Sequence, residues 1–250
     1  GRRFKVESRT FLIRGRSTSL LLHRWIIPRS DHVFVQSEKM AVDFAKKGAN
    51  PARMTRVITG VDLDGVEPIP RPVRGSAPRT LTIGYLGTLV RQRRLEILVD
   101  ILDELRHRGV AARLLLIGDG AVPEDRLCIE RRARELRLET QVEITGFLPR
   151  REALMLVQAA DICVSPFRPS PALAVASPTK LVEYLALGLP VVANSHPDQT
   201  QVLRESRAGV CVPWGARHFA RAILWLSRRS DAQLAEMGRL AAEQGMVRKS

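Results

Sequence analysis

Four residues near the start of one expected helix have the types and spacing needed to hold a phosphate and a sugar diol. The N–H groups of Thr179, Lys180 and Leu181 would lie free at the positive end of the helix dipole, and Lys180 adds a full charge. Glu183 follows Thr179 by four residues, so its carboxylate shares that face and can accept hydrogen bonds from a diol. Phosphate and ribose together indicate a nucleotide. The alternative is an ordinarily capped helix with a solvated Glu183.

The sequence marks both ends of this helix and the strand that follows it. Ser177 is a favourable N-cap, and Pro178 fits the first helical position, where its missing N–H costs nothing. Gly188 can adopt the left-handed conformation after the helix, and Pro190 prevents the helix from resuming. Residues 190–193 are short and apolar, which indicates a strand covered on both faces.

A glycine turn followed by arginines offers further groups for a phosphate. Gly87 follows the expected strand at 81–86 and allows a ligand to approach the backbone closely. Arg91, Arg93 and Arg94 lie at or just before the start of the next helix, and guanidinium groups there suit a diphosphate. The stretch lacks the Gly-x-Gly-x-x-Gly pattern of dinucleotide-binding proteins. For at least one arginine, a solvated basic helix start is the alternative.

Two more loops follow expected strands and have the composition of ligand-contacting turns. Gly118 and Gly120 end the strand at 113–117 and could let a ligand lie on the backbone, although a plain turn explains them nearly as well. The loop at 146–150 could hold a flat base through backbone contacts, with Phe147 packing beneath it.

A regular alternation of strands and helices is needed to position these loops. Apolar runs predict strands at 81–86, 113–117, 141–145, 161–165, 190–193 and 209–212. Helical patterns separate most of these runs, and the clearest of them covers Leu95 to Leu105. The alternation predicts an α/β fold with a Rossmann-like parallel sheet wound on both faces. In such sheets ligands bind at the carboxyl ends of the strands.

The first quarter of the chain has a different organisation. Residues 1–30 are basic and include an amphipathic run at 11–27, which predicts a helix that docks to the domain body or lies on a membrane. A buried strand at 31–36, a helix capped by Ser37 and a short strand at 53–58 follow. The Pro- and Gly-containing stretch at 64–79 predicts an interdomain linker.

Composition limits the class of protein and of partner. The 250 residues are 45% hydrophobic, with no apolar run long enough to span a bilayer, so a soluble globular protein is expected. The net charge of +14 directs attention to an anionic partner or environment, for which nucleic acid, acidic lipid and nucleotide are the options. Because the basic residues are dispersed and aromatics make up 5%, an acidic membrane surface is favoured over nucleic acid.

Cysteine and histidine usage indicates the compartment and favours reduced thiols over a disulfide framework or a metal site. The three cysteines are widely spaced in apolar contexts, which fits buried reduced thiols and a cytoplasmic protein. No histidine pair has metal-ligand spacing, and none has partners that indicate a triad. His196 follows the strand at 190–193 and could face the site, but it is interpreted as a surface loop residue.

Six motifs together resemble the retaining family-4 glycosyltransferases of GT-B fold, in family order and at family spacing. They are Gly84-Tyr-Leu-Gly-Thr-Leu89, Leu116-Ile-Gly-Asp-Gly120, Thr145-Gly-Phe-Leu-Pro149, Ala160-Asp-Ile-Cys-Val-Ser-Pro166, Ser177-Pro-Thr-Lys-Leu-Val-Glu-Tyr-Leu-Ala-Leu-Gly-Leu-Pro-Val-Val-Ala193 and Ala208-Gly-Val-Cys-Val-Pro213. The resemblance implies that 1–63 is the end of an acceptor-side domain, 64–79 a linker and 80–250 the nucleotide-sugar-binding domain.

The resemblance also implies an activity and roles for individual residues. The family transfers a sugar from a nucleotide sugar, UDP- or GDP-linked, to a glycan, lipid-linked or small-molecule acceptor, without a required metal or other cofactor. Glu183 matches the second of the family's paired glutamates, which binds ribose. Thr179 and Lys180 fall where the donor phosphate meets the helix start, and Arg93 falls at the phosphate-binding Lys. The reduced cysteines and the basic charge favour a cytoplasmic location for such an enzyme, at the inner face of the cell membrane.

Three departures from the family pattern modify these expectations. Val175 stands where the first paired glutamate would be, eight positions before Glu183. Thr88 replaces the usual phosphate-binding Arg, for which Arg91 or Arg94 would substitute. Most of the N-terminal domain and its active-site His are absent and the chain stops near the family's final helix. No catalytic residue is therefore assigned, and this fragment by itself is not expected to turn over.

Two other functions are compatible with these residues. A sugar-nucleotide epimerase of GT-B fold would give an epimerised nucleotide sugar without an acceptor. A non-catalytic nucleotide-sugar-binding module would explain Val175 and Thr88.

Overall fold

The chain forms two compact units, which are described separately. The computed structural model describes residues 21–57, 60–69, 80–170 and 173–247. The first unit is Gly1–Val57 and the second is Ile58–Ser250. This division falls before the boundary expected at residue 63, because Val61, Leu63 and Val66 are buried in the core of the second unit. The rest of the expected linker, residues 70–79, lies outside the described residues, as does the expected amphipathic run up to residue 20.

The described part of the first unit contains a parallel pair of strands and short helices. Its elements are η1 (Leu22–Ile26), α2 (Ile27–Arg29), β1 (Val33–Val35), α3 (Glu38–Lys46), η2 (Pro51–Arg53) and β2 (Met54–Arg56). The Ser37 hydroxyl accepts a hydrogen bond from the N–H of Met40 at 3.1 Å, which confirms the predicted N-cap. The prediction that β1 is buried is wrong for Phe34, whose side chain is 69% exposed. In a sheet with two described strands, one face of β1 remains uncovered.

The second unit is built on one parallel sheet. Its strands are β3 (Leu81–Leu86), β4 (Ala112–Ile117), β5 (Val142–Ile144), β6 (Ile162–Ser165), β7 (Val191–Asn194) and β8 (Gly209–Val212). They lie in the order β5-β4-β3-β6-β7-β8, and every neighbouring pair is parallel. The predicted α/β fold and all six predicted strands are confirmed. The order reverses between β3 and β6, so the carboxyl ends of the central strands face a crevice.

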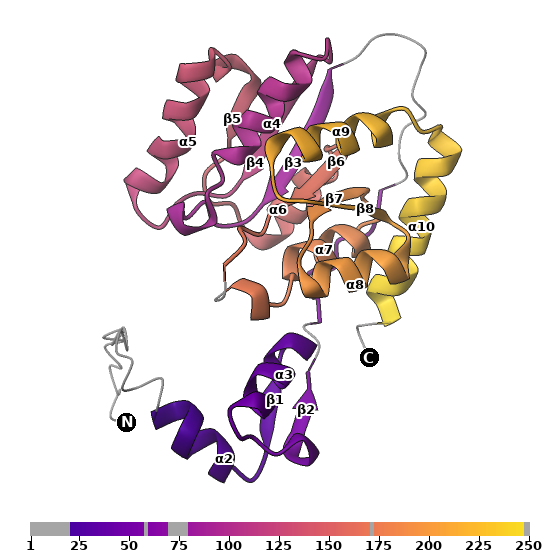
Figure 1. The fold of residues 1–250 in the computed structure, drawn as a ribbon. Coiled ribbons are helices and arrows are strands. Elements are labelled where there is room, and N and C mark those ends of the chain that lie inside the picture. The colour runs from indigo at the N-terminus through magenta and orange to yellow at the C-terminus, as the bar shows by residue number, and fades with distance from the viewer. Residues whose placement is uncertain (1–20, 58–59, 70–79, 171–172, 248–250) are drawn as a thin grey trace, which may run out of the picture. The chain divides into compact units, whose positions relative to one another are not determined.

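Helices cover both faces of the sheet because successive strand residues point to opposite sides. Ile83 and Tyr85 pack on one side, together with α4 (Ile97–Arg106), α5 (Pro123–Leu136) and α9 (Ala216–Ser227). The other core contains side chains from α6 (Arg150–Val157), α7 (Thr179–Ala186) and α8 (Pro197–Ser206). The long α10 (Asp231–Val247) packs on α7 and α8 (Figure 1). Short 3₁₀ turns η3 (Arg91–Arg93), η4 (Glu139–Gln141) and η5 (Leu173–Val175) complete the unit.

The ends of α7 differ in how well the sequence predicted them. Gly188 has φ +68°, which confirms the left-handed position after the helix. The start is one residue later than expected: Pro178 occupies the N-cap position, and no side chain caps the helix. The prediction that Ser177 is the N-cap is therefore wrong. Its carbonyl instead accepts the N–H of Thr179 at 3.0 Å, in a tight turn that precedes the helix.

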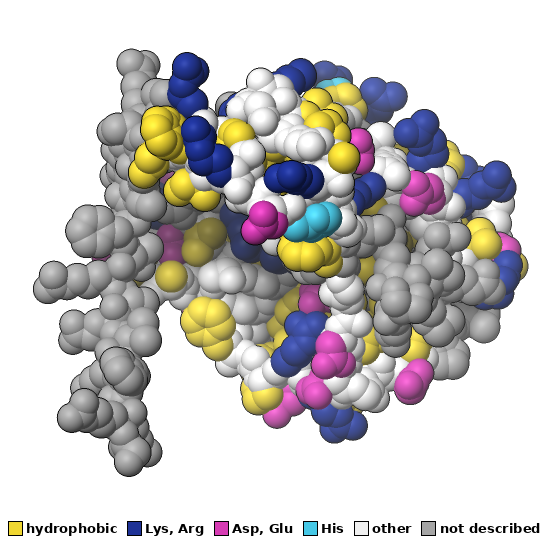
Figure 2. Space-filling model, turned by 90° about the horizontal axis from the view of Figure 1, so that it is seen from below, with side chains coloured by type: hydrophobic (Ala, Val, Ile, Leu, Met, Phe, Trp, Pro, Cys, Tyr) yellow, Lys and Arg dark blue, Asp and Glu magenta, His cyan; other side chains and the backbone are white. Residues whose placement is uncertain are grey.

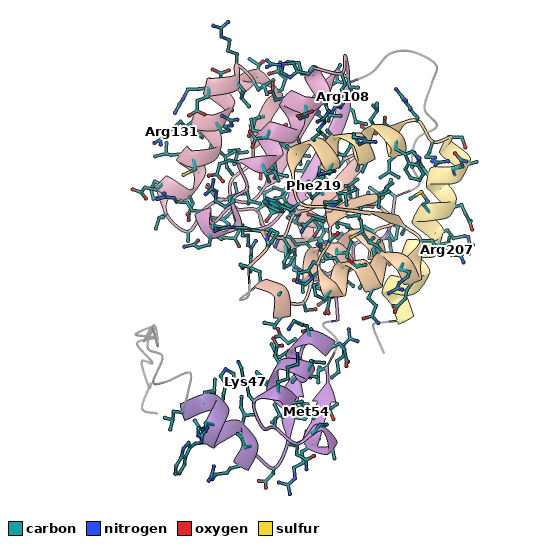
Figure 3. The ribbon with its side chains drawn as sticks, in the orientation of Figure 1. Lys47, Met54, Arg108, Arg131, Arg207 and Phe219 are labelled. Carbon is teal, nitrogen blue, oxygen red and sulfur yellow. The ribbon has the colours of Figure 1, made fainter. Side chains whose placement is uncertain are left out.

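The interior and the surface have the side chains expected of a globular unit. Phe219 points from α9 into the core and is fully buried, whereas Arg131 on α5 is exposed (Figure 3). Lys and Arg side chains are dispersed among Asp and Glu over the described part of the face in Figure 2. Among the described residues, no helix is both long and apolar enough to cross a membrane.

Candidate functional site

A pocket of about 470 Å³ lies at the carboxyl ends of β3 and β4 and at the start of α7. Its walls come from the loops that follow β3, β4 and β5 and from the first turns of α6 and α7. Six of the nine residues predicted from the sequence line it: Gly87, Gly118, Phe147, Thr179, Lys180 and Glu183. The topology thus brings together residues that are up to about 100 positions apart in the chain.

The other three predicted residues lie elsewhere. Arg93 lines an adjoining cavity of about 140 Å³, which shares Thr179 and Lys180 with the first. The Leu181 side chain is buried in the core, so only its backbone belongs to the first turn of α7. The Arg91 side chain is exposed and lines neither cavity. The structure therefore does not bring Arg91 to the site.

A hydrogen bond from its backbone N–H fixes the position of Arg91. The Asp125 carboxylate accepts hydrogen bonds from the N–H of Arg91 at 2.9 Å and of Ala121 at 3.0 Å. These bonds hold the pKa of Asp125 below its usual range, and the bond from the Arg91 N–H has the largest effect. They tie η3 to the loop after β4 and leave the Arg91 side chain outside.

Two glycines form the floor of the pocket and allow two loops to touch. Gly118 has φ +135°, and a Cβ there would lie 2.4 Å from the Gly87 carbonyl oxygen. Gly87 has φ +138°, and a Cβ there would lie 2.1 Å from Cε of Lys180. Any larger residue would separate the loops or expel the lysine, so the turn chemistry predicted from the sequence is required for packing.

Lys180 is a half-buried cation that lines both cavities. Burial lowers its pKa to about 8; the nearby charge of Arg93 adds to this effect, and Glu183 opposes it. The ammonium lies 5.8 Å from the centre of the Tyr85 ring. At neutral pH the group is mostly protonated, and a bound anion would both pair with it and stabilise its charge.

Glu183 is buried and has a partner that the sequence did not reveal. Nη2 of Arg150 lies 2.9 Å from its Oε1, and the same Nη2 donates to the Asp62 carbonyl at 2.6 Å. Arg150 is the first residue of α6 and directly follows Pro149. The only feature of the sequence that could have identified it as a site residue was its position in the loop after a predicted strand. The pair neutralises the carboxylate, and the remaining lone pairs of Glu183 are still able to accept hydrogen bonds.

Arg93 is held by neutral groups. Its Nη1 donates to the Tyr85 hydroxyl at 3.2 Å and to the Thr88 carbonyl at 3.0 Å. The guanidinium charge is therefore aimed into the adjoining cavity without a carboxylate of the described residues paired to it.

Phe147 and His196 differ from their predicted environments. Phe147 is 68% exposed at the rim of the pocket and does not pack beneath the loop, because the loop at 146–149 turns its ring outward. His196, expected at the surface, is 6% exposed. Its Nε2 lies 2.8 Å from the Leu173 carbonyl oxygen and its ring packs on Phe167, because the loop after β6 folds over it.

A doubly wound parallel sheet with a cationic pocket at its switch point defines the class of doubly wound α/β proteins, which bind their ligands at that point. The chain belongs to the family described as glycosyl transferases group 1, which matches residues 80–229. The predicted resemblance is thereby confirmed.

Curated relatives agree with this family. The chain is 28% identical over 228 residues to WcaL of Escherichia coli K12, which is assigned to colanic acid biosynthesis as a glycosyltransferase; the match covers 88% of this chain and 53% of WcaL. It is 26% identical over 208 residues to a GDP-mannose-dependent α-(1-6)-phosphatidylinositol dimannoside mannosyltransferase of Mycobacterium tuberculosis (strain ATCC 25177 / H37Ra), covering 80% and 51%. The chain thus spans about half the length of these relatives.

Solved structures show the same fold. Sucrose-phosphate synthase from Thermosynechococcus elongatus superposes with a TM-score of 0.74 at 21% identity, over 94% of this chain and 58% of that one. HepE from Anabaena, solved with UDP and glucose, gives 0.73 at 17% identity, over 94% and 65%. These likenesses confirm the predicted GT-B-type fold.

The glycine floor predicts a difference between two substitutions. Gly109 also has a positive φ, +72°, but a Cβ there would meet nothing within 4 Å. Gly109→Ala should cost about 1 kcal/mol from backbone strain alone. Gly118→Ala adds a clash with the Gly87 backbone and should cost roughly 2 kcal/mol more. Urea unfolding of the two variants measures both, and equal losses would show that the loops separate freely.

Proposed function

We propose that the second unit binds the nucleoside diphosphate part of a nucleotide sugar and that the whole protein transfers the sugar to an acceptor with retention of configuration. One observation carries the proposal. Lys180, the first turn of α7 and the buried Glu183 share one pocket at the carboxyl edge of the sheet. The pocket thus offers an anion site and a diol acceptor one helical turn apart.

The proposed role of the cationic groups is to stabilise the departing diphosphate. Negative charge grows on the leaving group as the bond to the sugar breaks. The Lys180 ammonium, the Arg93 guanidinium and the N–H groups of Lys180 and Leu181 are already in place to receive it, whereas the N–H of Thr179 donates to the Ser177 carbonyl. Because these groups are preorganised and partly desolvated, they would lower the barrier without a metal or other cofactor.

The nucleoside would lie across the glycine floor. We propose that the ribose hydroxyls donate to Glu183, which shares its carboxylate with Arg150. The base would lie against Gly118 and the exposed ring of Phe147, which offers an apolar face. Backbone contacts of this kind suit either uracil or guanine. One curated relative is GDP-mannose-dependent and one structural neighbour was solved with UDP.

The acceptor and the location are proposals about the whole protein. A glycan or lipid-linked acceptor, handled in the cytoplasm at the inner face of the membrane, is supported by relatives named for colanic acid and phosphatidylinositol dimannoside chemistry. We propose that the residues that bind the acceptor and complete catalysis lie outside the second unit, on the acceptor side to which the first unit would belong.

The ribose role of Glu183 is tested by calorimetric titration with UDP and GDP. Glu183→Gln keeps the shape of the side chain but removes its charge. It should lower the affinity for whichever of the two nucleotides binds by roughly tenfold. Glu152→Gln, an exposed carboxylate on α6, is the matched control and should bind as the wild type does. The 2′,3′-dideoxy diphosphate should bind both Glu183 forms equally. Unchanged affinity of Glu183→Gln for the ribose form would remove the proposed role.

The lowered pKa of Lys180 predicts that donor binding depends on pH. The ammonium attracts the diphosphate only while protonated, so affinity should be constant below about pH 7 and fall as pH rises through 8. Between pH 7 and 9 we expect a loss of roughly tenfold for UDP-glucose or GDP-mannose. Lys180→Met should bind more weakly and show no such fall.

Arg93→Gln provides a directional control for this pH dependence. It removes a cation that lowers the pKa of Lys180, so the fall in affinity should move to higher pH. An identical pH profile in Lys180→Met and wild type would exclude Lys180 from the diphosphate site.

Peripheral contact with an acidic membrane is proposed for the first unit. Leu22, Trp25 and Ile26 are exposed on η1, and Arg29 stacks 4.6 Å from the Trp25 ring centre. Apolar and basic groups on one helix suit an anionic lipid surface. A variant with all three apolar residues changed to Ser should lose sedimentation with phosphatidylglycerol vesicles. The control is the triple variant Val122→Ser/Leu127→Ser/Trp225→Ser, which changes exposed apolar residues of the second unit and should still sediment with the vesicles. If both triple variants sediment equally well, the first unit does not make the membrane contact.

A further inference from the structure

The smaller cavity, beside the proposed diphosphate site, is lined by an unusual balance of charge. It measures about 140 Å³ and adjoins the larger pocket through Thr179 and Lys180. Three cationic residues line it, namely Arg93, Arg168 and Lys180, and none of the described residues that line it is acidic. If the nucleoside lies in the larger pocket, the sugar beyond the diphosphate extends into or along this cavity.

None of the three cations forms an ion pair with a carboxylate of the described residues, although Glu183 partly offsets the charge of Lys180 and Arg168 also lines a neighbouring cavity with Glu96 and Asp100. Arg93 donates to a hydroxyl and a carbonyl, both uncharged, at 3.2 and 3.0 Å. Arg168 is exposed and forms no ion pair with a described carboxylate. Glu183, the nearest carboxylate in the larger pocket, is already paired with Arg150. The cavity therefore holds a surplus of cations that a ligand can neutralise.

The loop that carries Arg168 is held by a buried polar network. Asn194 exchanges two hydrogen bonds with the backbone of Phe167, accepting from its N–H at 2.6 Å and donating to its carbonyl at 2.8 Å. Gln199 accepts from the Ser165 hydroxyl at 2.5 Å, and His196 lies 2.8 Å from the Leu173 carbonyl oxygen. The backbone of Phe167, immediately before Arg168, is thus fixed before a ligand arrives, which lowers the entropic cost of ordering this part of the loop.

A count of charges indicates what the third cation is for. The diphosphate of a nucleotide sugar carries two negative charges, which Arg93, Lys180 and the start of α7 suffice to meet. If the sugar of the donor is neutral, the donor has no further negative charge that could pair with the third cation, Arg168. Val175 lies in η5, beside residues that line the cavity, and its side chain is apolar. It offers no carboxylate that could accept hydrogen bonds from the hydroxyls of a neutral sugar, and none that would repel an anionic sugar.

We infer that the sugar of the donor is itself anionic, a hexuronate whose carboxylate pairs with Arg168. This inference rests on the proposed donor-binding function and deepens it by naming the substrate class. A planar guanidinium can hold a carboxylate through two parallel hydrogen bonds, which a hydroxymethyl group cannot reproduce. Arg168 would then determine specificity, whereas Arg93 and Lys180 would serve every nucleoside diphosphate.

Two pairs of donors test the inference, because the members of each pair differ only at C6 of the sugar. They are UDP-glucose against UDP-glucuronate and GDP-mannose against GDP-mannuronate, titrated calorimetrically into the protein together with UDP and GDP. In the pair whose base is accepted, the uronate should bind roughly ten- to a hundredfold tighter than the neutral sugar. Arg168→Gln should remove that difference while leaving the affinity for the free nucleotide within about twofold.

Arg204→Gln is the matched control, since it removes one exposed arginine of the same unit from α8 and should preserve the preference. Equal binding of neutral and anionic donors, with UDP or GDP bound, overturns the inference and leaves the proposed function standing. A parallel loss of free nucleotide and both donors in Arg168→Gln also overturns it, because Arg168 would then serve the diphosphate. If neither nucleotide binds, the proposed function itself fails, and the inference with it.

Discussion

The burial of the Lys180 ammonium beside Gly87 is the constraint on which the rest of the site depends. The lysine fits only because Gly87 has no side chain, and Gly87 can sit there only because Gly118 lets the two loops touch. A cation held in so little water is costly unless something anionic shares the site. Arg93 makes this cost larger, and Glu183 reduces it in part. The arrangement is therefore poised for an anionic ligand.

The pairing of Glu183 with Arg150 divides the site electrostatically. On the side near the start of α6, the Glu183 carboxylate is neutralised by Arg150 and can still accept further hydrogen bonds. The other side, under η3 and the loop after β6, has arginines without acidic partners among the described residues. A ligand with a diol at one end and negative charge towards the other matches this division, as a nucleotide sugar does. The fold and the charge distribution thus support the same class of ligand.

The boundary between the two units also follows from burial. The segment that carries Val61 and Val66 belongs to the second unit because these side chains complete the core under α6 and α7. The Asp62 carbonyl in the same segment accepts a hydrogen bond from Arg150. The segment that immediately precedes the expected linker thereby helps to orient a pocket residue. Composition marked the prolines and glycines from residue 64 onward as a linker, but it did not show that Val66 among them is buried.

The sequence by itself determined the α/β class, the six strands, the left-handed Gly188 and most of the pocket, because these follow from local periodicity and from the rule that carboxyl ends of parallel strands share an edge. Only the tertiary structure decided which charges meet. Arg150 finds Glu183, Arg91 turns away and His196 is buried, because side-chain direction and burial depend on neighbours distant in the chain. Local sequence sets backbone geometry, whereas packing sets the partners of each charge.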